Sequence, residues 1–111
     1  MVKSRETERG DIVWIDFDPT KGHEQAGLRP AIVISPSKYN SMTGLALVCP
    51  ITRKQKGYFF EVAIDGPESE SYALVDQIRS IDIKERIIKK SGKITNIEMD
   101  EILSRVAFLF Q

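Results

Sequence analysis

Short apolar segments separated by turn residues make up most of the chain, and this pattern limits it to a mainly β fold. Residues 11–18 alternate Val13, Ile15 and Phe17 with side chains of the opposite face, which is the period of a strand. Residues 31–35 are continuously apolar and β-branched, which predicts a strand buried on both faces. Further strands are predicted at residues 45–51, 58–64, 72–81 and 87–90, and a turn of helix at residues 37–40.

The C-terminal segment carries a helical pattern instead. Thr95 and Glu98 have the spacing of a capping box, and Ile94 and Met99 have the spacing of a hydrophobic staple, so a helix is predicted over residues 96–109. Its apolar stripe, which we expect to pack against the sheet, comprises Met99, Ile102, Leu103, Val106 and Phe110. Short strands followed by one terminal helix predict a mainly β fold with helices (α+β). The expected form is a small, strongly bent antiparallel sheet or barrel in a single domain, residues 1–111.

Two residues of the strand at 45–51 carry information of their own. Cys49 lies in an apolar run and is interpreted as a small core residue, and as the only cysteine it excludes an intramolecular disulfide and a multi-cysteine zinc site. Pro50 predicts an edge strand or a bulge near the end of this segment.

The sequence has no apolar run long enough to span a membrane and no apolar centre of a secretory signal near Met1, so a cytoplasmic location without membrane contact is expected.

The net charge is zero, with 16 Lys and Arg against 16 Asp and Glu, so bulk charge does not indicate a nucleic-acid binder. The polar loop at residues 19–28 is longer than most connections in a compact domain, and such loops are usually functional or disordered. Arg29 follows it and precedes Pro30, which disfavours helical backbone at the arginine. A cation held at the start of a buried strand beside a polar loop indicates a site for an anion or a phosphate.

Several catalytic classes are excluded or disfavoured. A single histidine, His23, cannot form a two-histidine acid–base pair, and neither a Gly-x-Ser-x-Gly elbow nor a complete phosphate-binding loop is present. Asp16 and Asp18 share one face of a strand and could bind a divalent cation, but such a pair more often faces solvent or an opposite charge. No metal and no cofactor are therefore expected.

The remaining candidates are Glu24, Arg29, Thr52 and Lys56, at strand ends and in loops. If the strands at 31–35 and 45–51 pair in antiparallel fashion, Arg29 at the start of one lies beside Thr52 at the end of the other. A guanidinium, a hydroxyl and a carboxylate could together stabilise extra negative charge on a reacting phosphate. The structural alternative is that Arg29 simply pairs with Glu24 while Thr52 caps a turn.

Longer motifs resemble a known family. They are Gly-Asp-Ile-Val-Trp-Ile-Asp-Phe-Asp-Pro at residues 10–19, Glu-Gln-Ala-Gly-Leu-Arg-Pro at 24–30, Ser-Pro-Ser-Lys-Tyr-Asn at 35–40, Val-Cys-Pro-Ile-Thr at 48–52, Lys-Gly-Tyr at 56–58 and Asp-Gln at 76–77. Together they resemble the MazF/PemK (Kid) family of toxin endoribonucleases over residues 8–85, and more loosely over the terminal helix.

The resemblance implies an SH3-like barrel, a homodimer, and metal-independent cleavage of single-stranded RNA at a short sequence, which inhibits translation and growth. The products would carry a 2′,3′-cyclic phosphate and a 5′-hydroxyl, because the RNA's own 2′-hydroxyl is the nucleophile. The implied partner is a cognate antitoxin whose disordered acidic tail occupies the RNA groove. The toxin–antitoxin complex would in turn bind DNA at its own promoter.

The resemblance also assigns roles to residues. Arg29, Thr52 and Glu24 fall on the family's catalytic positions, with Arg29 expected to stabilise the phosphorane by charge, because a guanidinium does not give up its proton near neutral pH. Trp14, Phe17 and Tyr58 are candidates for stacking on splayed bases, and Trp14 equally for core packing or a dimer contact. Expected RNA contacts are Asp16, Phe17, Lys21, Arg53, Lys54, Lys56, Tyr58, Asp76, Gln77 and Arg79.

Two other classes of function share this architecture. A non-catalytic toxin of the same barrel would bind DNA gyrase, and a small interaction domain would bind a peptide in a groove. Arg29, Thr52 and the loop carrying Glu24 suit phosphate chemistry and are not needed in a gyrase binder, so these residues favour the ribonuclease hypothesis.

Overall fold

The computed structural model describes residues 6–16, 28–66 and 69–111 of the chain. Within this part, seven strands and three helices follow one another along the chain. Their bounds are β1 (Asp11–Asp16), β2 (Leu28–Val33), α1 (Ser37–Thr43), β3 (Leu45–Thr52), β4 (Glu61–Asp65), β5 (Glu70–Leu74), β6 (Arg79–Asp82), α2 (Ile83–Arg86), β7 (Ile87–Lys93) and α3 (Asn96–Phe108). The expected class, a mainly β fold with a C-terminal helix, is confirmed.

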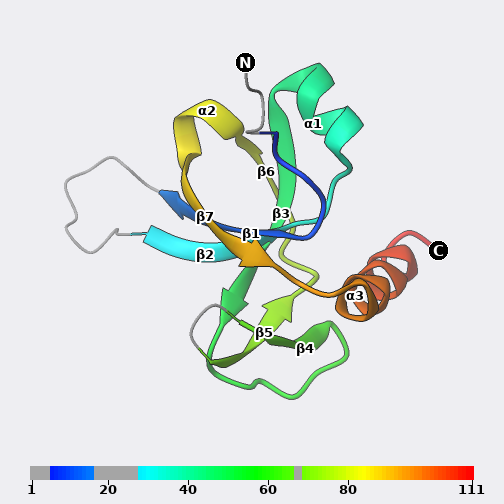
Figure 1. Cartoon of the computed structure of the whole chain (residues 1–111). Coiled ribbons are helices and arrows are strands. Elements are labelled where there is room, and N and C mark those ends of the chain that lie inside the picture. Colours follow the sequence, from blue (N-terminus) through cyan, green and yellow to red (C-terminus); the bar gives the residue numbers. More distant parts are fainter. Residues whose placement is uncertain (1–5, 17–27, 67–68) are drawn as a thin grey trace.

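The strands form one strongly curved antiparallel sheet in the order β4-β5-β3-β2-β1-β7, with β6 also paired to β3 (Figure 1). Strand β3 therefore lies inside the sheet, and the expectation that Pro50 marks an edge strand is wrong. On the side away from β2, β3 pairs with β6 as far as Val48 and with β5 from Ile51 onward. Pro50, which has no N–H to donate, lies in the gap between these two ladders.

The predicted strand at 72–81 is in fact two strands, β5 and β6. The chain advances from Ala73 to Arg79 while its partners on β3 change only from Ile51 to Val48, so the residues between loop out. A turn closed by a hydrogen bond from the Gln77 N–H to the Leu74 carbonyl (3.1 Å) takes up this excess. No glycine or proline stands between residues 72 and 81 to mark the break, which is why the sequence pattern concealed it.

Strand boundaries elsewhere are partly shifted. The predicted strand at 58–64 begins only at Glu61, because the Glu61 N–H donates to the Tyr58 carbonyl (3.1 Å) and closes a turn ahead of it. Strand β2 begins earlier than predicted, at Leu28, and ends at Val33. The short helix α2 was not predicted; Asp82 caps it by accepting a hydrogen bond from the Glu85 N–H (3.0 Å).

The sheet has an apolar cluster on each face. Ile32 packs in the larger cluster, whereas Ala31 and Val33 pack in the smaller one, so β2 is buried on both faces as predicted. Cys49 belongs to the larger cluster as expected, and its burial raises the pKa of the thiol to about 12. The central strands are thereby held from both sides, which gives the strand ends that carry Arg29 and Thr52 a rigid base.

Helix α3 covers one side of the sheet, and its capping box is present (Figure 1). The Thr95 hydroxyl accepts the Glu98 N–H (3.1 Å), and the Glu98 carboxylate accepts the N–H groups of Thr95 (2.9 Å) and Asp65 (3.0 Å). Ile94, Met99 and Ile102 are buried in the larger cluster, which places most of the predicted stripe against the sheet. Phe110 was wrongly included in the stripe, because it lies beyond the end of α3 and is 79% exposed. In the described part of the chain, no helix is long and apolar enough to cross a membrane.

We expect Thr95→Ala to lower the free energy of unfolding by about 1 kcal/mol, because it removes the side-chain acceptor for the Glu98 N–H. Urea denaturation followed by circular dichroism measures the change. Thr95→Ser keeps the hydroxyl and should remain within about 0.5 kcal/mol of the parent. Equal losses in the two variants would contradict a capping role.

Candidate functional site

Arg29 and Thr52 lie beside each other at one end of the β2–β3 pair. The ladder pairs Val33 with Val48, Ile32 with Cys49 and Ala31 with Pro50. Continued by two residues, this register places Arg29 opposite Thr52, with both side chains on the same face of the sheet. Both residues line one cavity, which agrees with the predicted juxtaposition of a guanidinium and a hydroxyl, while their catalytic roles stay predictions.

The two residues line a cavity of about 420 Å³. The other lining residues are Trp14, Pro30, Ile51, Arg53, Lys54 and Ser71. Apolar side chains from β1, β2 and β3 therefore meet cationic side chains at the same cavity. Such a surface fits a ligand that has both a flat apolar part and a negative charge, as a nucleotide does.

The Thr52 hydroxyl oxygen accepts a hydrogen bond from the Lys54 backbone N–H (3.1 Å). This contact is the turn-capping role that the sequence left open as an alternative. It uses one lone pair only, so the Thr52 hydroxyl proton can still be donated to a phosphoryl oxygen. The same contact also draws the start of the basic loop, residues 53–57, toward Thr52.

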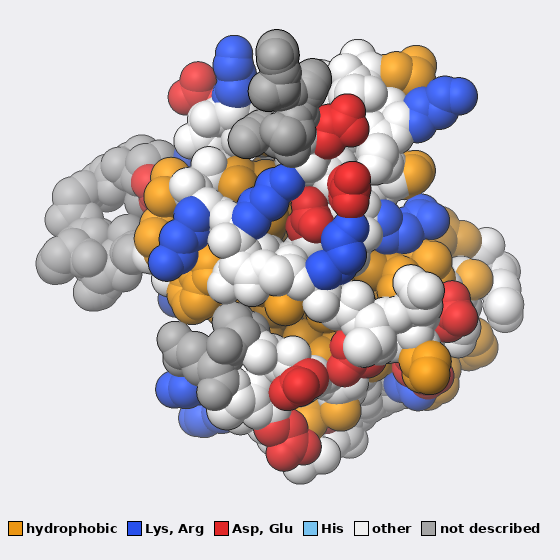
Figure 2. All heavy atoms as spheres, in the orientation of Figure 1, with side chains coloured by type: hydrophobic (Ala, Val, Ile, Leu, Met, Phe, Trp, Pro, Cys, Tyr) orange, Lys and Arg blue, Asp and Glu red, His pale blue; other side chains and the backbone are white. Residues whose placement is uncertain are grey.

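The cations near this cavity differ from those on β7 in whether they form ion pairs with acidic side chains. On the face that carries β7, Lys and Arg side chains alternate with acidic ones (Figure 2), and Lys90 and Lys93 form ion pairs with Asp11 and Glu8. Within the described part of the chain, no ion pair joins Arg29, Lys54 or Lys56 to an acid. Among the described residues, no acidic side chain therefore competes with a ligand for these three positive charges, and the alternative pairing of Arg29 with Glu24 lies outside the described residues.

Trp14 forms one wall of the cavity and is partly buried. The Lys89 ammonium lies 5.7 Å from the centroid of its ring, and its buried Nε1 has no hydrogen-bond partner within the described structure. Trp14 is paired with Pro30 across the β1–β2 ladder. Its ring therefore forms part of the cavity wall and also packs against the sheet. The two interpretations of Trp14, stacking and packing, are therefore compatible.

Tyr58, Asp76 and Gln77 form a second group. The Tyr58 hydroxyl donates to Asp76 Oδ1 (2.6 Å), and this bond, with burial and the negative charge of Asp76, raises the pKa of Tyr58 to about 12. The side chain of Gln77 also contacts the Tyr58 hydroxyl and by itself lowers the pKa of Tyr58. None of these three residues lines the cavity of Arg29, so the structure separates the predicted RNA contacts into at least two groups.

The other predicted contacts are dispersed. Asp16 is the last residue of β1, and its carbonyl accepts a hydrogen bond from the Arg86 guanidinium (3.3 Å). Arg79, the first residue of β6, lies opposite Val48 of β3. Lys56 is exposed in the loop before β4. Phe17, Lys21 and Glu24 lie outside the described residues, as does His23.

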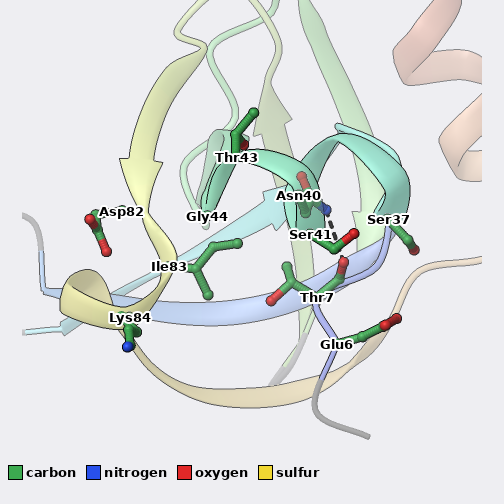
Figure 3. Close-up of a pocket in the computed structure, with 10 residues that line it drawn as sticks. All are labelled: Glu6, Thr7, Ser37, Asn40, Ser41, Thr43, Gly44, Asp82, Ile83 and Lys84. Carbon is green, nitrogen blue, oxygen red and sulfur yellow. Dashed lines mark hydrogen bonds between the residues drawn. The ribbon is translucent and has the colours of Figure 1, made fainter. Parts of the chain in front are cut away.

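A second cavity, of about 450 Å³, lies between the N-terminal segment, α1 and the junction of β6 with α2 (Figure 3). Asn40 is buried there and donates to the Thr7 carbonyl (2.9 Å). Its described lining contains none of the predicted site residues. Among the described residues, no group of three or more His, Cys, Asp or Glu could hold a metal ion.

Sequence reasoning missed Glu61. Its carboxylate accepts the backbone N–H groups of Lys56 (2.5 Å) and Gly57 (2.8 Å). No residue spacing indicates this contact, because it depends on the shape of the loop between β3 and β4. The glycine at position 57 is a sequence signal of a tight turn, and in the structure Gly57 has a φ of +77°.

Fold and site together define a small β protein with a cationic cavity suited to a phosphate-bearing ligand. Residues 8–110 match the family described as "PemK-like, MazF-like toxin of type II toxin-antitoxin system". The chain belongs to this family.

Individual members of this family are similar to the chain in sequence and in structure. The chain is 45% identical over 109 residues to the endoribonuclease toxin MazF of Escherichia coli strain K12, covering 98% of both chains. The crystal structure of MazF from Deinococcus radiodurans matches with a TM-score of 0.79 at 36% identity, over 94% of this chain and 96% of that one. A MazE–MazF structure from the same organism matches with a TM-score of 0.77 at 30% identity, over 94% of each chain.

Proposed function

We propose that this chain is a type II toxin that cleaves single-stranded RNA, with the scissile phosphodiester bound between Arg29 and Thr52. The observation that carries this proposal is that Arg29 and Thr52, at the ends of the neighbouring strands β2 and β3, line one cavity together with Arg53 and Lys54. The endoribonuclease names of the relatives support this function over a gyrase-binding toxin.

Cleavage is a transfer within the RNA. The 2′-oxygen forms a bond to phosphorus and loses its proton to a base, while the bond from phosphorus to the 5′-oxygen breaks and that oxygen takes a proton from a water molecule. The Arg29 guanidinium matches the geometry of phosphoryl oxygens and stabilises the additional charge of the phosphorane. Thr52 donates its hydroxyl proton to a phosphoryl oxygen. Glu24 is the proposed base.

The relatives' structures also suggest partners. A MazE–MazF complex is among the matching structures, so a cognate antitoxin is the proposed protein partner, with an acidic tail that competes with RNA for Arg29, Lys54 and Lys56. The resulting complex is proposed to bind DNA at its own promoter, in the cytoplasm.

A homodimer is proposed through the aromatic cluster of Phe59, Phe60 and Phe108. The ring centroids of Phe59 and Phe108 are 5.1 Å apart, yet these side chains are 51% and 53% exposed. Large apolar side chains clustered on a surface in this way usually mark an interface.

The test is a cleavage assay on labelled single-stranded RNA in the presence of EDTA. We expect fragments with 2′,3′-cyclic phosphate and 5′-hydroxyl ends, and no cleavage at a site whose nucleotide is 2′-deoxy, because the nucleophile is then missing. Activity that EDTA abolishes and Mg²⁺ restores would contradict the mechanism. Inhibition of gyrase without RNA cleavage would support the alternative toxin.

A further inference from the structure

Glu61, the first residue of β4, holds the loop that leads away from Thr52. Its Oε2 accepts the Lys56 N–H (2.5 Å) and its Oε1 accepts the Gly57 N–H (2.8 Å). Its own N–H donates to the Tyr58 carbonyl (3.1 Å). Both carboxylate oxygens and the backbone of this one residue are therefore engaged with residues 56–58.

The loop is fixed at its other end by Thr52, whose hydroxyl accepts the Lys54 N–H (3.1 Å). Between these two attachments lie the side chains of Arg53, Lys54 and Lys56, of which the first two line the cavity of Arg29. The positions of these cations therefore depend on both attachments.

The geometry of the second attachment favours a charged acceptor. Gly57 has φ of +77°, a left-handed conformation that can direct consecutive backbone N–H groups toward a common point. Hydrogen bonds from such N–H groups to a carboxylate are shorter and stronger than those to a neutral oxygen. Glu61 also occupies a pair of donors that would otherwise be open to an anion from solution.

We propose that Glu61 is a positioning residue for RNA binding, which sets where Lys54 and Lys56 meet the phosphate backbone. This role rests on the proposed function. Glu61 itself does not touch the reacting phosphate. Its carboxylate is directed at the backbone of the loop, whereas Arg29 is held by pairing with β1 and Thr52 by pairing with β5.

The first test separates KM from kcat in the cleavage assay. Glu61→Ala should raise KM for RNA roughly tenfold with kcat changed less than about twofold, because the loop loses its attachment while the strand ends remain. The KM of Glu61→Gln should lie between those of the parental chain and Glu61→Ala, since its amide offers one acceptor oxygen in place of two. Glu85→Ala, which removes an exposed carboxylate from α2, should leave both constants unchanged.

The second test needs no activity. In the NMR spectrum of the parental chain, the amide protons of Lys56 and Gly57 should lie downfield, because both are donated to a carboxylate. In Glu61→Ala both should shift upfield. Amide protons that show no such response would overturn the assignment of the contact.

The outcomes distinguish this inference from the proposed function. A parental chain that cleaves no RNA would count against the proposed function itself. If the parental chain cleaves RNA but Glu61→Ala keeps the parental KM, only the role of Glu61 is overturned. A variant that loses thermal stability and kcat together at unchanged KM would show Glu61 to be structural only.

Discussion

Arg29→Ala is expected to lower kcat for RNA cleavage by about 10²–10³-fold while RNA still binds. The side chain is exposed at the end of β2, so its loss should not disturb either apolar cluster. Binding should persist because Arg53 and Lys54 still line the cavity. Single-turnover cleavage measures the chemical step, and fluorescence anisotropy with an uncleavable 2′-deoxy oligonucleotide measures the affinity.

Two further variants make this prediction specific. Arg29→Lys keeps the positive charge but loses the planar fork that contacts two oxygens at once, so it should recover only part of the rate. Lys84→Ala removes an exposed cation from α2, outside the cavity of Arg29, and should cleave RNA at the parental rate. If Arg29→Ala also cleaved RNA at the parental rate, the assignment of the site would be wrong.

The position of this site was predictable because it follows from simple rules. A proline after Arg29 fixes extended backbone, and antiparallel pairing brings the start of one strand to the end of the next. Neither rule depends on distant parts of the chain, and together they brought Arg29 to Thr52. The loop contacts of Glu61 and the hydrogen bond from Tyr58 to Asp76 follow no such local rule, and they were not predicted.

The errors in the fold have a similar cause. The segment from residue 72 to residue 81 contains no glycine or proline, so no local signal indicated that the strand ends at Leu74 and a second one begins at Arg79. Pro50 was expected at an edge or a bulge because a proline usually leaves a ladder incomplete. It instead lies where β3 changes partners, a position defined only once both partners are in place.

The C-terminal helix was predicted accurately, because capping and periodicity are local, and its packing leads to a second large effect. Ile102→Ala is expected to lower the free energy of unfolding by about 2–5 kcal/mol. Ile102 is fully buried in the larger apolar cluster, where α3 meets the sheet. The truncation leaves a cavity that neighbours such as Met99 fill only in part. Urea denaturation measures the loss, and a shift of the melting temperature by about 10 °C should accompany it.

Ile97→Ala is the matched control, because it makes the same substitution in the same helix at a side chain that is 80% exposed. It should change stability by no more than about 0.5 kcal/mol. A large difference between the variants would show that packing against the sheet, rather than helix propensity, holds α3 in place. Similar small effects in both would mean that the helix contributes little to the fold. In that case the apolar stripe would serve a partner and not the core, which the burial of Met99 and Ile102 argues against.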